Sequence, residues 1–206
     1  FSDPYFKEIA QGIVSFTRCE LSHPDGGFYA SQDADVTPDD EGGYFTWTDD
    51  DFKALLTNEE YTVLAPFFLH EKAMMHHDAS KRVLYIDKPP EDVAKMISMD
   101  VETVNTLIEQ GKKKLLAARE KRTKPFIDTA LYSSLNGMYI SAFLKAYRIF
   151  RDSDIKDFAL NSLEKILAIN TDGGKVFHTP GIKGLLDDYI HLIDALVSAY
   201  EVTGDT

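Results

Sequence analysis

Residues 128–151 read DTALYSSLNGMYISAFLKAYRIFR, and this stretch carries the strongest helical pattern of the chain. Its apolar side chains recur every three or four residues, which is the spacing of one helix face. They are Leu131, Leu135, Met138, Tyr139, Ala142, Phe143, Ala146 and Ile149. Asp128 is a residue type that caps helix amino termini, so we predict a largely apolar helix over 129–151.

An asparagine and a glycine, Asn136 and Gly137, stand inside this predicted helix. A glycine in a helix interior costs roughly 1 kcal/mol relative to alanine, so its presence calls for a structural reason. The sequence predicts that the two residues mark a close contact with another helix. A site at the helix end is the alternative that the pattern leaves open.

The same spacing, together with cap and turn residues, predicts further helices on both sides of this stretch. They are expected at about 3–20, 49–56, 58–69, 89–98, 101–121, 153–169 and 185–202. Two short strands, at 27–32 and 43–48, are predicted to form a hairpin around a polar loop, and 175–179 is predicted to be extended. Sustained strands are few, so we expect no central sheet and an all-α fold with short β-hairpin excursions.

The composition restricts the classes of protein that remain. The chain has 206 residues, a net charge of −12 and 44% hydrophobic residues, which is enough to build a core. No apolar run is long enough for a membrane span, and the acidic balance argues against binding a nucleic-acid backbone. The chain starts at Phe1 without a visible signal peptide, so a processed or excised amino terminus is expected and a cytoplasmic location is favoured.

Neither a metal nor another cofactor is expected. Cys19 is the one cysteine, which excludes a disulfide framework, a CxxC redox pair and a cysteine-based zinc site within this chain. The remaining candidate ligands show no metal-binding spacing, so they are interpreted as surface or core histidines: His70, His76, His77, His178 and His191.

Charge is distributed unevenly along the chain. Ten acidic residues and no basic one lie between Arg18 and Lys53, whereas 112–124 is rich in lysine and arginine. The basic stretch is interpreted as the solvated face of a long helix, with an RNA or partner patch as the alternative.

The acidic segment allows three chemical interpretations. Its carboxylates could hold a hard cation, although the spacing differs from that of an EF-hand. Alternatively, Asp33 and Asp35 lie two residues apart, as strand neighbours on one face do, and could form an acid–base pair acting on a sugar. Tyr29, Tyr44 and Trp47 would then be the aromatic surfaces on which the sugar packs. In the third interpretation the loop closes a hairpin through side-chain hydrogen bonds to its own backbone.

A second cluster, Gly184 to His191, lies where the last helix is predicted to begin. Asp187 and Asp188 are adjacent there, and helix capping accounts for one of them. Consecutive side chains point in different directions, so the other acid is a candidate for a pocket, with Tyr189 beside it as a sugar contact.

Three motifs, in this order, give the chain a family resemblance. They are GGFYASQDAD…EGGYFTWT at 26–48, R-x-x-P-x-x-D…SS-x-NG at 122–137, and GLLDDYIHLIDALVSAYEVTGD at 184–205. Over nearly all of its length the sequence resembles the DUF255 family of YyaL-like and spermatogenesis-associated protein 20-like proteins. That family joins a thioredoxin-like domain to an α/α toroid similar to N-acylglucosamine 2-epimerases and six-hairpin glycosidases.

The resemblance implies a single α/α-toroid domain over 1–206, or a fragment of one, without the thioredoxin-like domain. It also implies carbohydrate binding or modification of the epimerase or glycosidase class. The catalytic candidates are Asp33, Asp35, Asp187 and Asp188, and the substrate-binding candidates are Tyr29, Trp47, Tyr189 and Asn136.

Two stretches depart from the family pattern in the central motif. The family's Asp-Asp-Lys stands here as Asp128-Thr129-Ala130, and its Ser-Trp-Asn-Gly stands as 134–137, Ser-Leu-Asn-Gly. The alternative function is therefore a non-catalytic scaffold that binds a partner protein. A carbohydrate is the expected ligand, and neither a nucleic acid nor a membrane is an expected partner.

Overall fold

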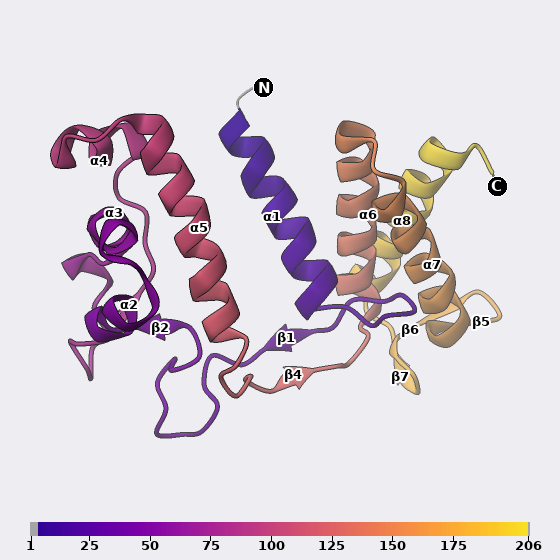
Figure 1. Ribbon diagram of the computed structural model, residues 1–206. Helices are drawn as coiled ribbons and strands as arrows, with labels where there is room; N and C mark the ends of the chain where they lie inside the picture. Colours follow the sequence, from indigo (N-terminus) through magenta and orange to yellow (C-terminus); the bar gives the residue numbers. More distant parts are fainter. Residues whose placement is uncertain (1–3, 206) are drawn as a thin grey trace. The chain divides into compact units, whose positions relative to one another are not determined.

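A computed structural model describes residues 4–205, which divide into two compact units (Figure 1). Unit 1 is formed by residues 4–32 and 127–205, and unit 2 by residues 33–126. Each unit has its own cluster of buried apolar side chains.

Unit 1 consists of four long helices and five short strands. The helices are α1 (Pro4–Glu20), α6 (Ser133–Phe150), α7 (Ser153–Asn170) and α8 (Leu186–Thr203). The strands are β1 (Ser31–Gln32), β4 (Ile127–Asp128), β5 (Thr171–Asp172), β6 (Lys175–Thr179) and β7 (Ile182–Lys183). β1 pairs antiparallel with β4, and β5, β6 and β7 form a three-stranded antiparallel sheet in the connection between α7 and α8.

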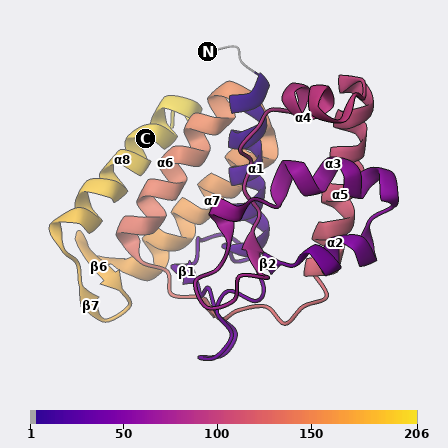
Figure 2. The same ribbon diagram turned by 90° about the vertical axis from the view of Figure 1, so that its left-hand side faces the viewer.

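The core of unit 1 forms around α6, which packs against both α7 and α8 (Figure 2). Phe28 lies at its centre with no exposed surface: its ring stacks on Tyr139 and meets Phe143 and Phe158 edge-on. The Arg18 guanidinium of α1 lies 3.7 Å from the centre of the Phe158 ring. One α1 residue is thereby held to α7 by a cation–π contact.

Gly137 allows α6 and α8 to approach closely, as its sequence context predicted. A Cβ atom at this position would lie 2.5 Å from the backbone carbonyl carbon of His191 on α8. Real Cβ atoms do not come so close to backbone, so a larger residue would push the helices apart. The prediction of a close helix contact at Gly137 is confirmed.

Unit 2 contains four helices, a 3₁₀ turn at Glu71–Ala73 and a two-stranded ladder. The helices are α2 (Asp49–Leu55), α3 (Asn58–Phe68), α4 (Pro90–Ile97) and α5 (Val101–Arg119), and β2 (Thr46–Trp47) pairs antiparallel with β3 (Arg82–Val83). Its core is lined by large apolar side chains, among them Phe52, Val63, Leu64, Val93 and Val104, none of which is exposed.

Helices α2, α3 and α5 of unit 2 begin at residues that cap them through side-chain hydrogen bonds. Thr48 and Asp51 form a reciprocal capping box at the start of α2, and Thr57 and Glu60 form another at the start of α3. Asp100 accepts a hydrogen bond from the Thr103 amide at the start of α5. These starts agree with the boundaries expected from the sequence.

Glu60 is 2% exposed yet remains ionised in this arrangement. Burial raises the pKa of its carboxyl, but hydrogen bonds from Lys114 and from the Thr57 amide outweigh burial and lower the pKa. The Lys114 Nζ lies 2.7 Å from the carboxylate. Part of the basic stretch on α5 is thus paired within unit 2.

The predicted hairpin between 27–32 and 43–48 is wrong. The first segment supplies β1, which pairs with β4, and the second supplies β2, which pairs with β3. Arg122 explains part of the difference, because its guanidinium donates to the carbonyls of Gly43, Tyr44 and Thr46 at 3.0, 3.2 and 2.6 Å. Those oxygens are therefore engaged by a side chain that follows α5.

The predicted start of the long apolar helix is also corrected. α6 begins at Ser133 rather than at 129, and Asp128 lies in β4, where its carboxylate accepts a hydrogen bond from the Ala130 amide. The all-α fold with short β excursions is confirmed, since residues 4–205 form eight α-helices and sheets of two or three strands. Closure into an α/α toroid, over one domain or a fragment of one, stays a prediction.

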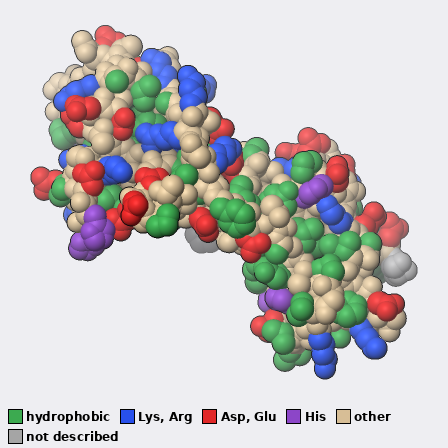
Figure 3. All heavy atoms as spheres, turned by 90° about the horizontal axis from the view of Figure 1, so that it is seen from below, with side chains coloured by type: hydrophobic (Ala, Val, Ile, Leu, Met, Phe, Trp, Pro, Cys, Tyr) green, Lys and Arg blue, Asp and Glu red, His purple; other side chains and the backbone are tan. Residues whose placement is uncertain are grey.

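The surfaces of the two units have a mixed character. Within residues 4–205 every helix is too short or too polar to cross a membrane. On the face drawn in Figure 3, acidic and basic side chains are interspersed with hydrophobic ones on each unit.

Candidate functional site

A buried carboxylate and a histidine meet at the start of α8 in unit 1. Asp188 has no exposed surface, and its two oxygens lie 3.0 and 3.1 Å from Nδ1 of His178, which comes from β6. The His178 side chain is 31% exposed. The hydrogen bonds therefore connect the fully buried Asp188 carboxylate to the imidazole ring of His178, which is partly exposed to solvent.

The position of Asp188 is fixed by backbone donors. Its carboxylate accepts hydrogen bonds from the Leu185 amide at 2.8 Å and from the Ser134 amide at 2.9 Å. The first bond caps α8, and the second reaches across to the first turn of α6. Since the carboxylate carries charge at both helix starts, the two amino-terminal dipoles favour its ionised form.

Electrostatics keep Asp188 ionised despite its depth. Burial raises the pKa of the carboxyl, but the hydrogen bonds from the Leu185 amide, the His178 ring and the Ser134 amide together outweigh burial. The pKa of Asp188 is therefore held below its ordinary value. An ionised carboxylate can only accept, so Nδ1 of His178 must be the donor.

This hydrogen bond determines what His178 can do. With the proton of the neutral ring on Nδ1, the other nitrogen, Nε2, carries a lone pair and can take up a proton. The negative charge of Asp188 would then stabilise the positively charged ring that results. A histidine oriented by a buried carboxylate in this way is the arrangement used by general bases.

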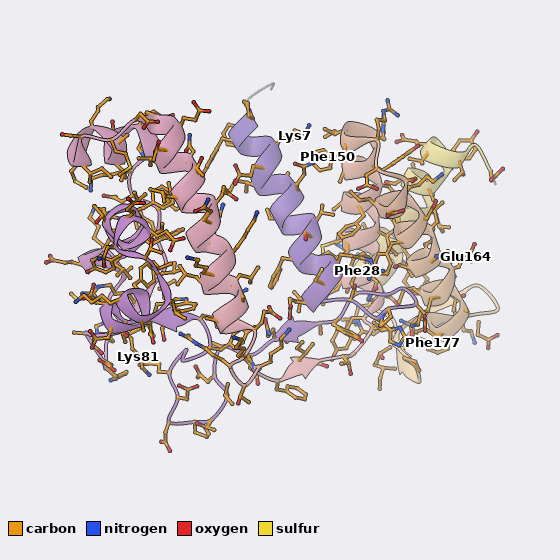
Figure 4. The ribbon with its side chains drawn as sticks, viewed as in Figure 1. Lys7, Phe28, Lys81, Phe150, Glu164 and Phe177 are labelled. Atoms are coloured by element: carbon orange, nitrogen blue, oxygen red, sulfur yellow. The ribbon has the colours of Figure 1, made fainter. Side chains whose placement is uncertain are left out.

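The residue before α6 and the first residue of α6 hold the ring and the strand that carries it. The Tyr132 ring stacks on His178 with centroids 4.7 Å apart and planes inclined by 22°. The Ser133 hydroxyl donates to the carbonyl of Phe177, which precedes the histidine, at 2.6 Å (Figure 4 labels Phe177). The Val176 amide donates a hydrogen bond to the Tyr189 hydroxyl oxygen at 3.1 Å, so Tyr189 holds β6 in position.

The two adjacent acids of α8 have different surroundings, but not in the way expected from the sequence, which assigned the cap to one acid and a pocket to the other. Asp188 caps the helix and faces the core, whereas Asp187 is exposed. The residue that sequence reasoning missed is His178. Neither its sequence spacing nor its neighbours in the sequence distinguish it from the other histidines. Its contact with Asp188 arises only when the chain turns between β6 and β7 and brings the two side chains together.

Both polar atoms of the Asn136 side chain form hydrogen bonds with backbone groups. The Phe28 amide donates to its Oδ1 at 2.7 Å, and its Nδ2 donates to the carbonyls of Phe28 at 3.0 Å and Tyr132 at 2.9 Å. It has no exposed surface. A substrate contact at Asn136 would require these bonds to break.

The segment held by Asn136 is the Gly-Gly-Phe turn, which Figure 4 marks by its Phe28 label. Gly26 and Gly27 both have positive φ, and a Cβ on Gly26 would lie 3.1 Å from the backbone nitrogen of Ser162 on α7. The Gly27 amide donates to the Ser162 hydroxyl at 2.9 Å. Glycine is therefore needed for both the conformation and the close approach. Tyr29 follows, half-buried, with its ring edge-on to His23.

The remaining candidates lie in unit 2. Asp33 and Asp35 are exposed, and the Gly42 amide donates to Asp35 Oδ1 at 2.8 Å. This bond is of the kind described in the third interpretation of the acidic segment, in which side chains close the loop on its own backbone. Trp47 is 3% exposed, and the Arg122 guanidinium lies 4.0 Å from its ring centre. A sugar could pack on Trp47 only after Arg122 moved.

Known proteins from animals are similar to this chain, although no protein-family model matches it. The chain is 26% identical over 241 aligned residues to spermatogenesis-associated protein 20 of Homo sapiens and 25% identical to that of Mus musculus, with 99% of the chain covered in each. An uncharacterized protein of Caenorhabditis elegans is 27% identical over 231 residues, with 96% of the chain covered.

These alignments extend along the chain but take in only part of the relatives. The chain spans about a third of their length, 31% for the human protein and 32% for the nematode one. The similarity to epimerases and glycosidases stays a prediction. Over nearly its whole length, the chain is similar to proteins named spermatogenesis-associated protein 20.

Proposed function

We propose that unit 1 carries an acid–base site that acts on a carbohydrate-like ligand, with Nε2 of His178 as the atom that takes up the proton. The observation that carries this proposal is the hydrogen bond between buried Asp188 and the partly exposed ring of His178. The resemblance noted in the sequence motifs supports a carbohydrate as the ligand class.

The chemistry that suits a single oriented histidine is proton transfer at a carbon beside a carbonyl, as in an open-chain sugar. Nε2 would remove that proton, the electron pair of the C–H bond would form the carbon–carbon double bond of an enolate, and the π pair of the carbonyl would move to its oxygen. Asp188 would stabilise the charged ring through Nδ1. A proton from solvent water added to the opposite face of the carbon, with the carbonyl re-forming and Nε2 releasing its proton to solvent, would complete an epimerisation.

Glycoside hydrolysis fits unit 1 less well. That reaction uses two carboxyl groups, one of which must be protonated to serve as the acid. The pKa of Asp188 is lowered by the hydrogen bonds that it accepts, so it is a poor proton donor. Epimerase-like chemistry is therefore the preferred class, with Tyr29 and Tyr189 retained as candidate sugar contacts.

The proposal is tested by solvent exchange, which reports removal of the proton whichever product forms. The chain is incubated in D₂O with a panel of hexoses and N-acetylhexosamines, and proton NMR follows loss of the signal from the carbon beside the carbonyl. We expect exchange with at least one sugar, and His178→Gln should slow it by about 100-fold or more, which is the usual contribution of a general base.

The controls separate the site from its alternatives. His76→Gln changes an exposed histidine of unit 2 and should leave exchange unchanged. The double variant Asp33→Asn, Asp35→Asn tests the carboxylate pair in the same assay. Exchange that survives His178→Gln would refute the role of His178, and the absence of exchange with every sugar would favour the non-catalytic scaffold.

A further inference from the structure

A cavity of about 230 Å³ opens beside helix α5 in unit 2. Most of its wall is apolar and comes from β2, α3, the segment after β3, and α5: Trp47, Phe68, Leu84, Leu115 and Leu116. Trp47, Phe68 and Leu115 are at most 7% exposed, whereas Leu116 is 49% exposed. Pockets for drug-sized ligands begin at about 300 Å³, so this cavity suits a smaller molecule with an apolar body.

Two basic residues of α5 complete the wall, and their charges are treated differently. The Lys112 Nζ lies 2.7 Å from the Glu109 carboxylate, so its charge is compensated within the helix. Arg119 has no acidic partner among the described residues, and its guanidinium lies 5.4 Å from the centre of the Tyr44 ring. Arg119 is therefore the uncompensated cation of this cavity.

The hydrogen bonding of Arg119 is incomplete as well. Its side chain is half-buried, and its Nε is buried without a hydrogen-bond acceptor. A buried donor that lacks an acceptor is unfavourable, so such donors are ordinarily paired. The edge formed by Nε and a terminal nitrogen is the one that binds a carboxylate through two parallel hydrogen bonds. A carboxylate in the cavity would supply the missing acceptor once that edge turns toward it.

A second arginine near Trp47 shows what a fully used guanidinium looks like in this unit. Arg122 lies 4.0 Å from the centre of the Trp47 ring and donates to three backbone carbonyls. Its Nη2 also lies 3.8 Å from the Asp51 carboxylate. Arg122 thus has a structural role that occupies its donors, whereas the donors of Arg119 remain available for a ligand.

The combination of walls and charge narrows the class of ligand. An inorganic anion would leave the apolar side chains uncovered, and a neutral apolar molecule would leave Arg119 without an acceptor. A nucleic-acid backbone requires several cations in a row, and Arg119 is the one cation of this cavity without an acidic partner. A single carboxylate on an apolar body satisfies both the walls and the cation.

We propose that this cavity of unit 2 binds a small organic acid, with its carboxylate on the Arg119 guanidinium and its apolar body against Trp47 and Leu115. The ligand class is argued from charge complementarity and volume. The cavity lies in the unit that does not contain His178, so either proposal can fail alone.

The test compares cyclohexanecarboxylate with its neutral isostere, cyclohexanecarboxamide. Neither compound absorbs where tryptophan is excited, and Trp47 is the one tryptophan of the chain. Trp47 fluorescence and calorimetry are measured as each compound is added to the full chain. The carboxylate should bind with a millimolar or lower Kd and at least about tenfold more tightly than the amide, because charge-assisted hydrogen bonds are the stronger ones.

Variants separate the contribution of the charge from that of the walls. Arg119→Gln should weaken the carboxylate at least about tenfold and leave the amide unchanged, and Arg119→Lys should fall between, since it keeps the charge but loses the two-bond edge. Leu116→Gln should weaken both compounds. The matched control is Lys113→Gln, an exposed lysine of the same helix outside the cavity, which should change neither. Circular dichroism confirms that each variant is folded.

Three outcomes overturn the proposal. The first is the absence of binding by cyclohexanecarboxylate, hexanoate and phenylacetate alike. The second is equal affinity for the acid and the amide, or equal weakening of the acid by Arg119→Gln and Lys113→Gln. The third is binding of the peptide Gly-Gly-Leu with a free terminal carboxylate at least about tenfold more tightly than the small acids, which would assign the cavity to the chain end of a partner protein.

Discussion

Asp188 combines two properties that oppose each other at the scale of one residue. Burial disfavours its charge, while three N–H donors favour it, and the donors prevail. Because its pKa in the folded chain lies below the unfolded value of about 3.9, the ionised form stabilises the fold above that pH. The stabilisation is lost as the pH falls through the lower folded pKa.

Asp188→Asn should therefore lower the free energy of unfolding at pH 7 by about 1–3 kcal/mol, because buried donors lose part of their acceptor. The stability of the variant should also fall less steeply than that of the unmodified chain as the pH drops below about 4. Urea unfolding at a series of pH values measures both effects. Asp187→Asn is the matched control, because its exposed carboxylate should contribute within about 0.5 kcal/mol.

Part of this site is recognisable in the sequence, and the rest is hidden from it for a physical reason. An acid at a helix start is a local signal, and Asp188 lies in such a pair. His178 reaches it through hydrogen bonds and a strand turn that depend on the packed unit, and no local spacing encodes them. The hydrogen bonds of Asn136 are likewise not encoded by local spacing. The resemblance implies a substrate contact for this residue, whereas its side chain binds the backbone of Phe28.

At the scale of elements, local signals predicted helices better than strands. The caps at Thr48, Thr57 and Asp100 act within three residues, so their sequence patterns are sufficient. Strand pairing depends on partners that are distant in the sequence. The backbone carbonyls of Gly43 and Thr46, in the second strand of the expected hairpin, accept hydrogen bonds from Arg122, more than seventy residues away. Asp128 likewise supports a turn rather than the helix start predicted for it.

The contact between α6 and α8 can be tested by one substitution made at two glycines. Gly137→Ala should destabilise unit 1 by about 1–3 kcal/mol, since the added methyl overlaps the backbone of α8. Gly12→Ala, on exposed α1 with open space around it, should instead stabilise the chain by up to about 1 kcal/mol. Thermal unfolding followed by circular dichroism compares the two, and shifts of the same sign would contradict the packing argument.

At the scale of the whole molecule, the described chain has two hydrophobic cores that share no residue. The acidic segment also finds local compensation in unit 2: Glu41 lies 3.5 Å from His77, and Asp40 lies 4.0 Å from Lys81. Composition predicted a core and an acidic surface. The composition could not predict that the buried apolar residues form two clusters, because that depends on which helices pack together.

Trp47 makes that division measurable, because it is the one tryptophan and lies in the core of unit 2. Leu64→Ala, in the same core, should lower the stability of unit 2 by about 2–5 kcal/mol and move the urea midpoint of tryptophan fluorescence. Leu144→Ala, in the core of unit 1, should shift the loss of helical circular dichroism and leave the fluorescence midpoint in place. Equal shifts of both signals by both variants would show that the two cores unfold as one.

The bonds between Asn136 and Phe28 also bear on the order in which the chain folds. They join residues 108 positions apart, so closing this loop costs more chain entropy than forming α6 and α7, which are sequence neighbours. The Gly-Gly-Phe turn gains these hydrogen bonds only when α6 presents the amide group of Asn136 to it. The amino-terminal helix and turn are therefore expected to join unit 1 after the rate-limiting step, so that truncating Phe28 accelerates unfolding and hardly slows folding.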